Sequence, residues 1–320
     1  MELKKISPKK VSKLSIVTPC YNEQDNILNL YAAVKKEITS LSEKYEFEHI
    51  FIDNHSVDKT PDILRDLAQK DPNVRVILNA RNFGHIRSPY YGLMQASGDA
   101  VMLVVADLQD PPHLIPNFIQ KWEEGFKIVV GVKRTSGENS LFYRIRKLYY
   151  RSLRYLSEVP IIENYTGFGL YDRKVLDILK SLDDPYPFFR GLICEIGFEK
   201  AIIPYDQPAR VRGFTKNNFY TLYDIGVLGI TSHSKKPLRL VAATGLVLSA
   251  ISLTISIIYF FYKLLYWNEF SLGLAPLILG LFFFSSIQLL FLGIIGEYIG
   301  NIYVKIMNRP IVVERERINF

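Results

Sequence analysis

The chain has 320 residues, of which 48% are hydrophobic, and a formal net charge of +7. This length is enough for one substantial folded domain with a small additional module. Two cysteines, Cys20 and Cys194, exclude a disulfide-rich fold and a cysteine zinc site. The positive charge suits either nucleic acid or an anionic lipid surface.

Short β-branched runs alternate with helical patterns through the first half of the chain. Strands are predicted over Leu14–Thr18, His49–Asp53, Val74–Leu78, Ala100–Ala106 and Lys127–Val132. Helices are predicted to begin near Asp25, Pro61, Ile86 and Pro112, with Thr60 as the N-cap of the second. The alternation predicts a mostly parallel, doubly wound α/β sheet. Ligands of such sheets bind beyond the carboxyl ends of the strands.

Two later segments, Ser140–Glu158 and Asn217–Ser234, are amphipathic and rich in basic and aromatic residues. Such a segment lies in a membrane interface or packs on the domain by its aromatic face, and the sequence leaves both alternatives open.

Two uncharged apolar stretches follow, Leu240–Tyr262 and Ser271–Gly296. Each is long enough to cross ~30 Å of hydrocarbon as a helix rising ~1.5 Å per residue. The loop between them has Lys263, offset by Glu269, whereas more basic residues lie outside them: Lys235, Lys236, Arg239, Lys305, Arg309, Arg315 and Arg317. The positive-inside rule therefore predicts an integral membrane protein with two spans and both termini and the main domain in the cytoplasm. A lipid bilayer is the expected partner, and nucleic acid is not.

Polar loops follow the first, second and fourth predicted strands, over residues 18–23, 53–60 and 106–112. One such loop is more often a turn than a site, but three at one edge of a sheet predict a shared crevice. Carboxylates there suit a hard divalent cation that bridges to a diphosphate. Neither standard Gly-rich phosphate loop is present, which disfavours P-loop and dinucleotide-binding folds.

The loops match a known series of motifs in order. Pro19, Tyr21, Asn22 and Glu23 match P-x-Y-N-E, and Asp53, Ser56, Asp58 and Thr60 match D-D-x-S-x-D-x-T. Arg81 to Gly84 match R-N-x-G, and Asp107, Gln109, Pro111 and Pro112 match the metal loop D-A-D-L-Q-x-P-P. Later matches are Arg210, Gly213, Thr215 and Lys216, then Gly296 to Tyr298, then Arg309 and Pro310. Over essentially its whole length the chain resembles the inverting family-two glycosyltransferases of GT-A fold, in the branch of polyprenyl-phosphate glycosyltransferases.

The resemblance implies transfer of a sugar from a nucleotide sugar to a polyprenyl phosphate with inversion. Glucose from UDP-glucose is expected, with mannose from GDP-mannose and other sugars as alternatives. The residues implied for the nucleotide are Pro19, Tyr21, Asn22, Glu23, Asp53, Ser56, Asp58, Arg81 and Gly84. Asp107 and Gln109 are implied for Mg²⁺ or Mn²⁺, and Lys133, Arg134, Arg210 and Lys216 for the acceptor phosphate. Asp107, Lys133 and Arg210 are the expected catalytic residues.

Three single positions and one short segment depart from the family pattern. Asn54 replaces an Asp of the second loop, and Val105 replaces the first Asp of the metal loop. Lys133 stands where the family has an Arg after the fifth strand, which keeps the charge but not the bidentate fork. The family's G-D-F-R-L segment reads Thr166 to Leu170, with Gly167 in place of the Asp and Gly169 in place of the Arg.

The expected organisation is a GT-A domain over 1–215, a juxtamembrane segment over 216–239, a two-helix membrane module over 240–303 and a cytosolic tail over 304–320. A processive polysaccharide synthase is disfavoured because the chain has no Q-x-x-R-W segment. A non-catalytic membrane scaffold is the alternative of another class, favoured by Val105 and Gly167. A homo-oligomer is left open.

Overall fold

The computed structural model describes residues 12–134, 162–208, 227–231, 234–266, 274–307 and 309–320. They form two compact units. The sheet unit holds the described residues up to 208 together with 309–320, and the helical unit holds those from 227 to 307.

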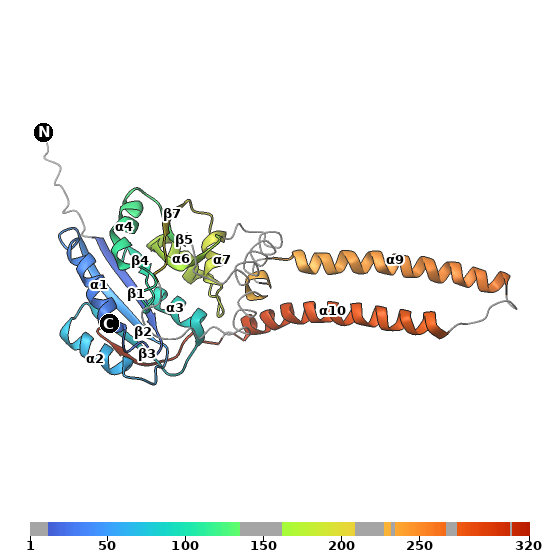
Figure 1. Cartoon of the computed structure of the whole chain (residues 1–320), viewed down its shortest axis with the longest axis horizontal. Coiled ribbons are helices and arrows are strands. Elements are labelled where there is room, and N and C mark those ends of the chain that lie inside the picture. The colour runs from blue at the N-terminus through green and yellow to red at the C-terminus, as the bar shows by residue number, and fades with distance from the viewer. Residues whose placement is uncertain (1–11, 135–161, 209–226, 232–233, 267–273, 308) are drawn as a thin grey trace. The chain divides into compact units, whose positions relative to one another are not determined.

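The sheet unit is built on one mixed sheet of eight strands. The strands are β1 (Ser12–Cys20), β2 (Tyr45–Asp53), β3 (Val74–Asn79), β4 (Ala100–Leu103), β5 (Ile128–Lys133), β6 (Tyr165–Asp172), β7 (Lys200–Tyr205) and β8 (Glu314–Ile318). Their order across the sheet is β7-β5-β6-β4-β1-β2-β3-β8 (Figure 1). Strands β1 to β4 are parallel, β6 is antiparallel to β4 and β5, and β8 is antiparallel to β3. The predicted α/β class is confirmed.

The five strands predicted from the first half of the sequence are all present. The fourth is shorter than predicted and ends at Leu103, because the backbone then turns out of the sheet toward the metal loop. The Val104 N–H still donates to the Val17 carbonyl over 3.0 Å, so the loop starts in register with β1. The carboxyl ends of β1, β2 and β4 therefore lie side by side, as the site prediction requires.

Helices cover both faces of the sheet. They are α1 (Ile27–Thr39), α2 (Thr60–Lys70), α3 (Gly84–Gln95), α4 (Ile115–Glu123), α6 (Arg173–Ser181) and α7 (Phe189–Glu195). Residues of α1, α2 and α4 pack into the core on one face, and residues of α3, α6 and α7 into the core on the other. A short 3₁₀ turn, Pro112–Leu114, precedes α4 where one continuous helix was predicted.

One correction concerns the start of α2. Thr60 is its first helical residue and not its N-cap, and Pro61 lies in the first turn as expected. The Thr60 hydroxyl instead accepts the Glu23 N–H over 2.9 Å. A residue predicted to cap the start of a helix thus joins two loops of the candidate site.

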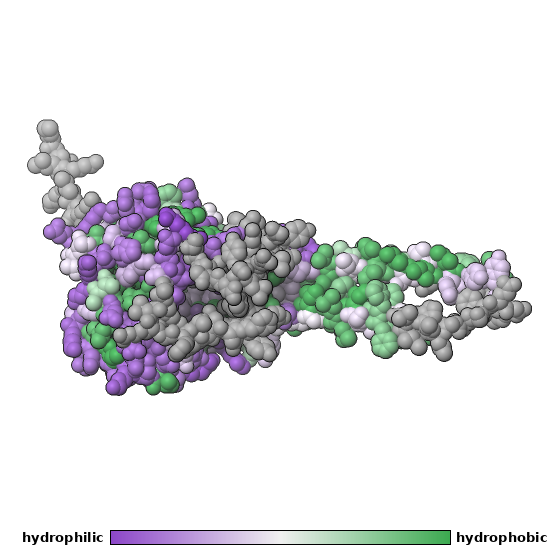
Figure 2. Space-filling model, viewed as in Figure 1, coloured by the Kyte–Doolittle hydropathy of each residue, from purple (hydrophilic) through white to green (hydrophobic). Residues whose placement is uncertain are grey.

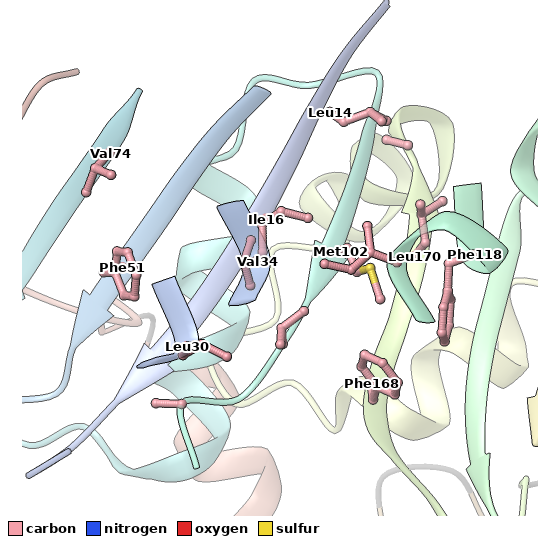
Figure 3. Close-up of a cluster of buried hydrophobic side chains, with 14 of the residues drawn as sticks. Leu14, Ile16, Leu30, Val34, Phe51, Val74, Met102, Phe118, Phe168 and Leu170 are labelled. Atoms are coloured by element: carbon pink, nitrogen blue, oxygen red, sulfur yellow. The ribbon is translucent and has the colours of Figure 1, made fainter. Parts of the chain in front are cut away.

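The core on the α1 face is closely packed (Figure 3). Leu30 and Val34 of α1 and Ile16 of β1 are almost completely buried. Phe118 of α4 packs against Phe168 of β6, with ring centroids 4.8 Å apart. Burying each large apolar side chain contributes about 1.5–3 kcal/mol to the stability of the fold. This core therefore holds α1, α2 and α4 in place, and the first turns of these helices border the site.

The helical unit contains two long helices, α9 (Lys236–Leu265) and α10 (Leu274–Ile306). The first helix extends beyond the predicted Leu240–Tyr262 at both ends. The second begins at Leu274 and continues past the predicted end at Gly296 to Ile306, and residues 271–273 lie outside the described residues. Two segments are long and apolar enough to cross a membrane, Lys236–Tyr262 and Gly280–Ile306. No residue in the most apolar part of either segment is buried. Figure 2 shows their hydrophobic surface in green, in contrast to the largely hydrophilic surface of the sheet unit.

The amphipathic segment 140–158 lies outside the described residues, as does 217–226. Of the second segment, Val227 to Thr231 are helical, and Ser234 is described. The side chain of Asn301 in α10 donates to the Thr231 hydroxyl, and the Tyr298 hydroxyl donates to the Ser234 carbonyl over 2.8 Å. The C-terminal part of α10 therefore holds the end of the juxtamembrane segment by polar contacts.

Candidate active site

The loops after β1 and β2 are joined by hydrogen bonds from backbone N–H groups to side chains. The Asn22 N–H donates to Ser56 Oγ over 2.8 Å, and the Val57 N–H donates to Asn22 Oδ1 over 2.9 Å. Asn22 has a positive φ of 55°, a conformation that Asn adopts more readily than most residues. The P-x-Y-N-E and D-x-S-x-D-x-T loops are thus one structural element, and Pro19, Tyr21 and Glu23 lie on it.

Asp53 ends β2 and is completely buried. Its carboxylate accepts the Ser56 N–H over 3.0 Å and also the Ser56 hydroxyl. Burial raises the pKa of Asp53, while the two bonds from Ser56 and the charge of Arg315 oppose the rise. Asp58 accepts the N–H of Thr60 over 3.0 Å, so both carboxylates of the loop shape its backbone.

Asn54 connects this loop to the R-N-x-G loop after β3. Its Nδ2 donates to Asn82 Oδ1 over 2.9 Å and to the Gly84 carbonyl over 3.1 Å. Its Oδ1 accepts the Phe83 N–H over 2.8 Å and Asn79 Nδ2 over 3.2 Å. An amide both donates and accepts whereas a carboxylate only accepts, so Asn suits this position better than the family's Asp. The sequence marked Asn54 as a departure and did not reveal this role.

We call the three loops after β1, β2 and β3 the donor side of the site: residues 18–23, 53–60 and 80–84. Within it, Arg81 is exposed and its guanidinium lies over the ring of Phe83, 4.1 Å from the centroid. Gly84 begins α3 with a φ of +86°, which favours glycine. The structure therefore brings together all the residues predicted to bind the nucleotide.

The metal loop after β4 turns sharply at Leu108, which has a φ of 60°. The Gln109 N–H donates to Asp107 Oδ1 over 3.1 Å, so Asp107 and Gln109 lie on one tight turn. Val105 offers no ligand atom. In the described part of the chain, no group of three or more His, Cys, Asp or Glu side chains converges on a metal position.

Asp110, which the sequence analysis did not select, is the buried acid of this loop. Its carboxylate accepts the Tyr205 hydroxyl over 3.1 Å, and the Val105 N–H lies 3.4 Å away. Burial raises the pKa of Asp110 to about 7, and the charge of Lys133 opposes the rise. Both oxygens face internal partners, so Asp110 ties the loop to β7 and does not replace the missing ligand at position 105.

Lys133 ends β5 and is half-buried, and Arg134 follows it with an exposed side chain. The Arg134 N–H donates to the Tyr205 carbonyl over 2.9 Å, which continues the β5–β7 ladder. The influence of Lys133 on Asp110 shows that its charge lies near the metal loop. Two of the four predicted acceptor-phosphate residues are thus placed at this edge; Arg210 and Lys216 lie outside the described residues.

The absent Asp and Arg of the G-D-F-R-L segment have a packing explanation. Gly167 has a φ of +113°, a conformation that is strained for any other residue. A Cβ on Gly169 would lie 2.6 Å from the Val129 carbonyl and 2.8 Å from the Tyr171 hydroxyl. The hydroxyls of Tyr171 and Tyr165 lie 2.5 Å apart in this buried region. We call the metal loop, the end of β5 and residues 164–170 the transfer side of the site.

The similarities to known proteins agree with this geometry. The model of glycosyl transferase family 2 matches residues 15–179. The chain is 34% identical over 300 residues to an uncharacterized glycosyltransferase of Synechocystis, covering 93% of each chain. It is 34% identical over 299 residues to the SfII prophage-derived bactoprenol glucosyl transferase of Shigella flexneri, covering 93% of this chain and 96% of the relative.

The chain belongs to glycosyl transferase family 2 and is a glycosyltransferase of GT-A fold. Its similarity to solved structures is more distant. A mannosyltransferase from Pyrobaculum calidifontis, in complex with GDP-Man and Mn²⁺, is 16% identical with a TM-score of 0.48, covering 94% of this chain and 89% of that one. Glucosyl-3-phosphoglycerate synthase from Mycobacterium tuberculosis is 20% identical with a TM-score of 0.47, covering 69% and 76%.

Proposed function

We propose that this chain transfers glucose from UDP-glucose to a polyprenyl phosphate at the cytoplasmic face of the membrane, with inversion. The observation that carries the proposal is the nearly full-length similarity to proteins named bactoprenol glucosyl transferase. One from Shigella phage SfV is 34% identical and covers 93% of this chain and 96% of its own. The similarity extends through the apolar helices. A glycosyltransferase that acts on a soluble acceptor would not need such helices.

The site residues suit this reaction. A phosphate monoester has a second pKa of ~6 and is already anionic at neutral pH, so the acceptor needs little help from a general base. The donor side binds the nucleoside, and Lys133 with Arg134 and Arg210 would bind the acceptor phosphate. These contacts would place the acceptor oxygen in line with the bond that breaks. The leaving diphosphate carries the bonding electrons away toward the metal loop.

A divalent cation, Mg²⁺ or Mn²⁺, fits the loop when the diphosphate supplies part of its coordination. Asp107 and Gln109 offer two oxygen ligands on one turn, whereas Val105 and the internally bonded Asp110 offer none. Mg²⁺ is commonly bound by one or two carboxylates with substrate phosphates and water, so a sparse protein site is sufficient. The cation would stabilise the negative charge that develops on the leaving group.

A donor screen tests the function. The purified full chain in detergent is given a short polyprenyl phosphate with UDP-glucose, UDP-galactose, UDP-N-acetylglucosamine or GDP-mannose, and the lipid is analysed by mass spectrometry. We expect a mass increase of one hexose with UDP-glucose. Product with GDP-mannose alone would establish the alternative donor. No lipid product and no released nucleoside diphosphate with any donor would favour the non-catalytic scaffold, to which Val105 and Gly167 point.

We also propose that both ends of the chain lie in the cytoplasm. β8 follows α10 in the sequence but pairs with β3, so the segments on either side of the α9–α10 hairpin belong to one folded unit. Both must then lie on one side of the bilayer, and the flanking basic residues select the cytoplasmic side. A reporter fused after Phe320 should be active only in the cytoplasm. Activity only on the opposite side would contradict this topology.

A further inference from the structure

The last strand of the catalytic sheet comes from the end of the chain, after both apolar helices. β8 lies along β3 at the edge of the sheet (Figure 1). Arg65 of α2 forms an ion pair with Glu316 over 2.7 Å. Asn319 donates from its side chain to the carbonyls of Ala68 over 2.7 Å and Val74 over 2.9 Å. These contacts hold β8 against α2 and fix the end of the chain beside β3.

An irregularity in the pairing places Arg315 at the carboxyl edge. Leu78 pairs with Glu316 and Asn79 pairs with Glu314, and the register shifts between them, so Arg315 is the additional residue of a β-bulge. Leu78 also pairs with Asp53 on the other side of β3. Arg315 and Asp53 therefore lie at the same level of the sheet, two strands apart.

The side chain of Arg315 is exposed. Within the described part of the chain, no hydrogen bond or ion pair holds its guanidinium. Its charge is near enough to Asp53 to oppose the increase that burial causes in the pKa of that carboxyl. Arg315 is thus a cation at the edge of the donor side, and no hydrogen bond or ion pair among the described residues accounts for its position.

The sheet order indicates which part of the nucleotide Arg315 would meet. The order β4-β1-β2-β3-β8 puts the metal loop two strands from Asp53 on one side and Arg315 two strands from it on the other. Neighbouring strands are about 4.8 Å apart, so each separation is roughly 10 Å. A nucleotide whose diphosphate lies at the metal loop would have its base and ribose near Asp53 and directed toward β8.

We propose that Arg315 binds the nucleoside end of the sugar donor, by hydrogen bonds to the base or ribose or by stacking on the base. This inference rests on the proposed function and names a residue of the donor site outside its sequence motifs. A guanidinium suits the task because it offers five donors and a planar face. The donor site is then complete only when the chain has returned from the apolar hairpin to the sheet.

The test is calorimetry on the full chain in detergent. UDP and GDP are first titrated into the wild type to find which nucleoside diphosphate binds. The affinities for that diphosphate and for the corresponding monophosphate are then measured in the wild type, Arg315→Ala and Arg315→Lys. Because Arg315 is exposed, we expect both variants to keep the wild-type melting temperature. Because Arg315→Ala removes a charged hydrogen bond, it should lower the affinities for the diphosphate and for the monophosphate by a similar factor, about tenfold. Arg315→Lys should weaken them less.

Arg317→Ala is the matched control. It removes an arginine from the same strand, but one that donates to Gln95 over 2.8 Å and pairs with Glu314. Its effect on nucleotide affinity should stay within about twofold. An equal loss in Arg317→Ala would show that strand anchoring causes the effect and would overturn the inference.

Three further results would also overturn it. Unchanged nucleotide affinity in Arg315→Ala would mean that Arg315 does not contact the donor, and the proposed function would stand without it. A much larger loss for the diphosphate than for the monophosphate would place the guanidinium at the phosphates. Binding of neither UDP nor GDP by the wild type would contradict the proposed donor site itself, and the inference would fail with it.

Discussion

The donor side and the transfer side of the crevice differ in how they are built. On the donor side, polar side chains hold the backbones of adjacent loops, as Asn54 holds the segment from Asn82 to Gly84. Almost every family motif there is matched. On the transfer side, Val105, Lys133, Gly167 and Gly169 all depart from the pattern.

This difference suggests that the two sides obey different constraints. The proposed nucleotide site is a backbone held in place by side chains, and changing one side chain of this joined set leaves several groups without partners. The transfer side is organised by aromatic packing around Gly167 and Gly169, with Tyr165, Tyr171 and Phe168 all buried. The family pattern has an Asp and an Arg there, whereas here the positive φ of Gly167 and the close packing around Gly169 disfavour larger side chains.

The largest expected effect is that of Asp107→Ala. Asp107 is the only carboxylate in the Val105–Gln109 turn. Its loss should raise the activation free energy by several kcal/mol and so reduce turnover about 100- to 1,000-fold or more. Turnover is measured as nucleoside diphosphate released in the presence of polyprenyl phosphate. Asp66→Ala, which removes an exposed carboxylate from α2, is the control. Turnover near the wild-type rate in Asp107→Ala, with or without added Mn²⁺, would show that the metal-loop assignment is wrong.

The next effect, that of Lys133→Ala, tests the transfer side. Loss of a charged hydrogen bond to the acceptor phosphate costs ~1.5–3 kcal/mol, so the efficiency with polyprenyl phosphate should fall roughly ten- to a hundredfold. Lys133→Arg should keep activity, because Arg restores the family's residue and its bidentate fork. Lys174→Ala, which removes an exposed lysine from α6, should behave as the wild type. Equal damage by Lys133→Arg and Lys133→Ala would contradict a role in phosphate binding.

A smaller effect is expected from Asn54→Ala on the donor side. The substitution leaves the Phe83 N–H and other buried groups without partners, so the free energy of unfolding should fall by about 2–3 kcal/mol. The Michaelis constant for the donor sugar should rise, while that for the lipid should not. Asn54→Asp keeps an acceptor for the Phe83 N–H and should be intermediate by thermal unfolding and kinetics. A stability of Asn54→Ala equal to that of the wild type would show that Asn54 does not join the two loops.

Much of the sheet and the donor side could be predicted from the sequence, because the information there is local. Alternating strand and helix patterns give β1 to β5, and the loop motifs follow the strand ends directly. β8 could not be predicted in this way, because Glu314–Ile318 is a short charged strand whose partner, β3, is more than 200 residues earlier.

The roles of Asn54 and Asp110 were also hidden in the sequence. Each depends on partners brought near by the fold, Asn79 to Gly84 for Asn54 and Tyr205 for Asp110. The sequence marked Gly167 and Gly169 as departures, but only the structure shows that Gly167 has a positive φ and that a Cβ on Gly169 would collide with the Val129 carbonyl. The single available signal was the unexpected amide at position 54, whose ability to donate and accept suggests a bridging role.

The central claim is that the donor side and the transfer side bind different substrates. Calorimetric titration of UDP into Lys133→Ala, in the absence of lipid, tests it most directly. The affinity for UDP should stay within about twofold of the wild-type value while lipid-dependent turnover falls roughly ten- to a hundredfold. A loss of UDP affinity as large as the loss of turnover would place Lys133 at the diphosphate and contradict the division of the crevice.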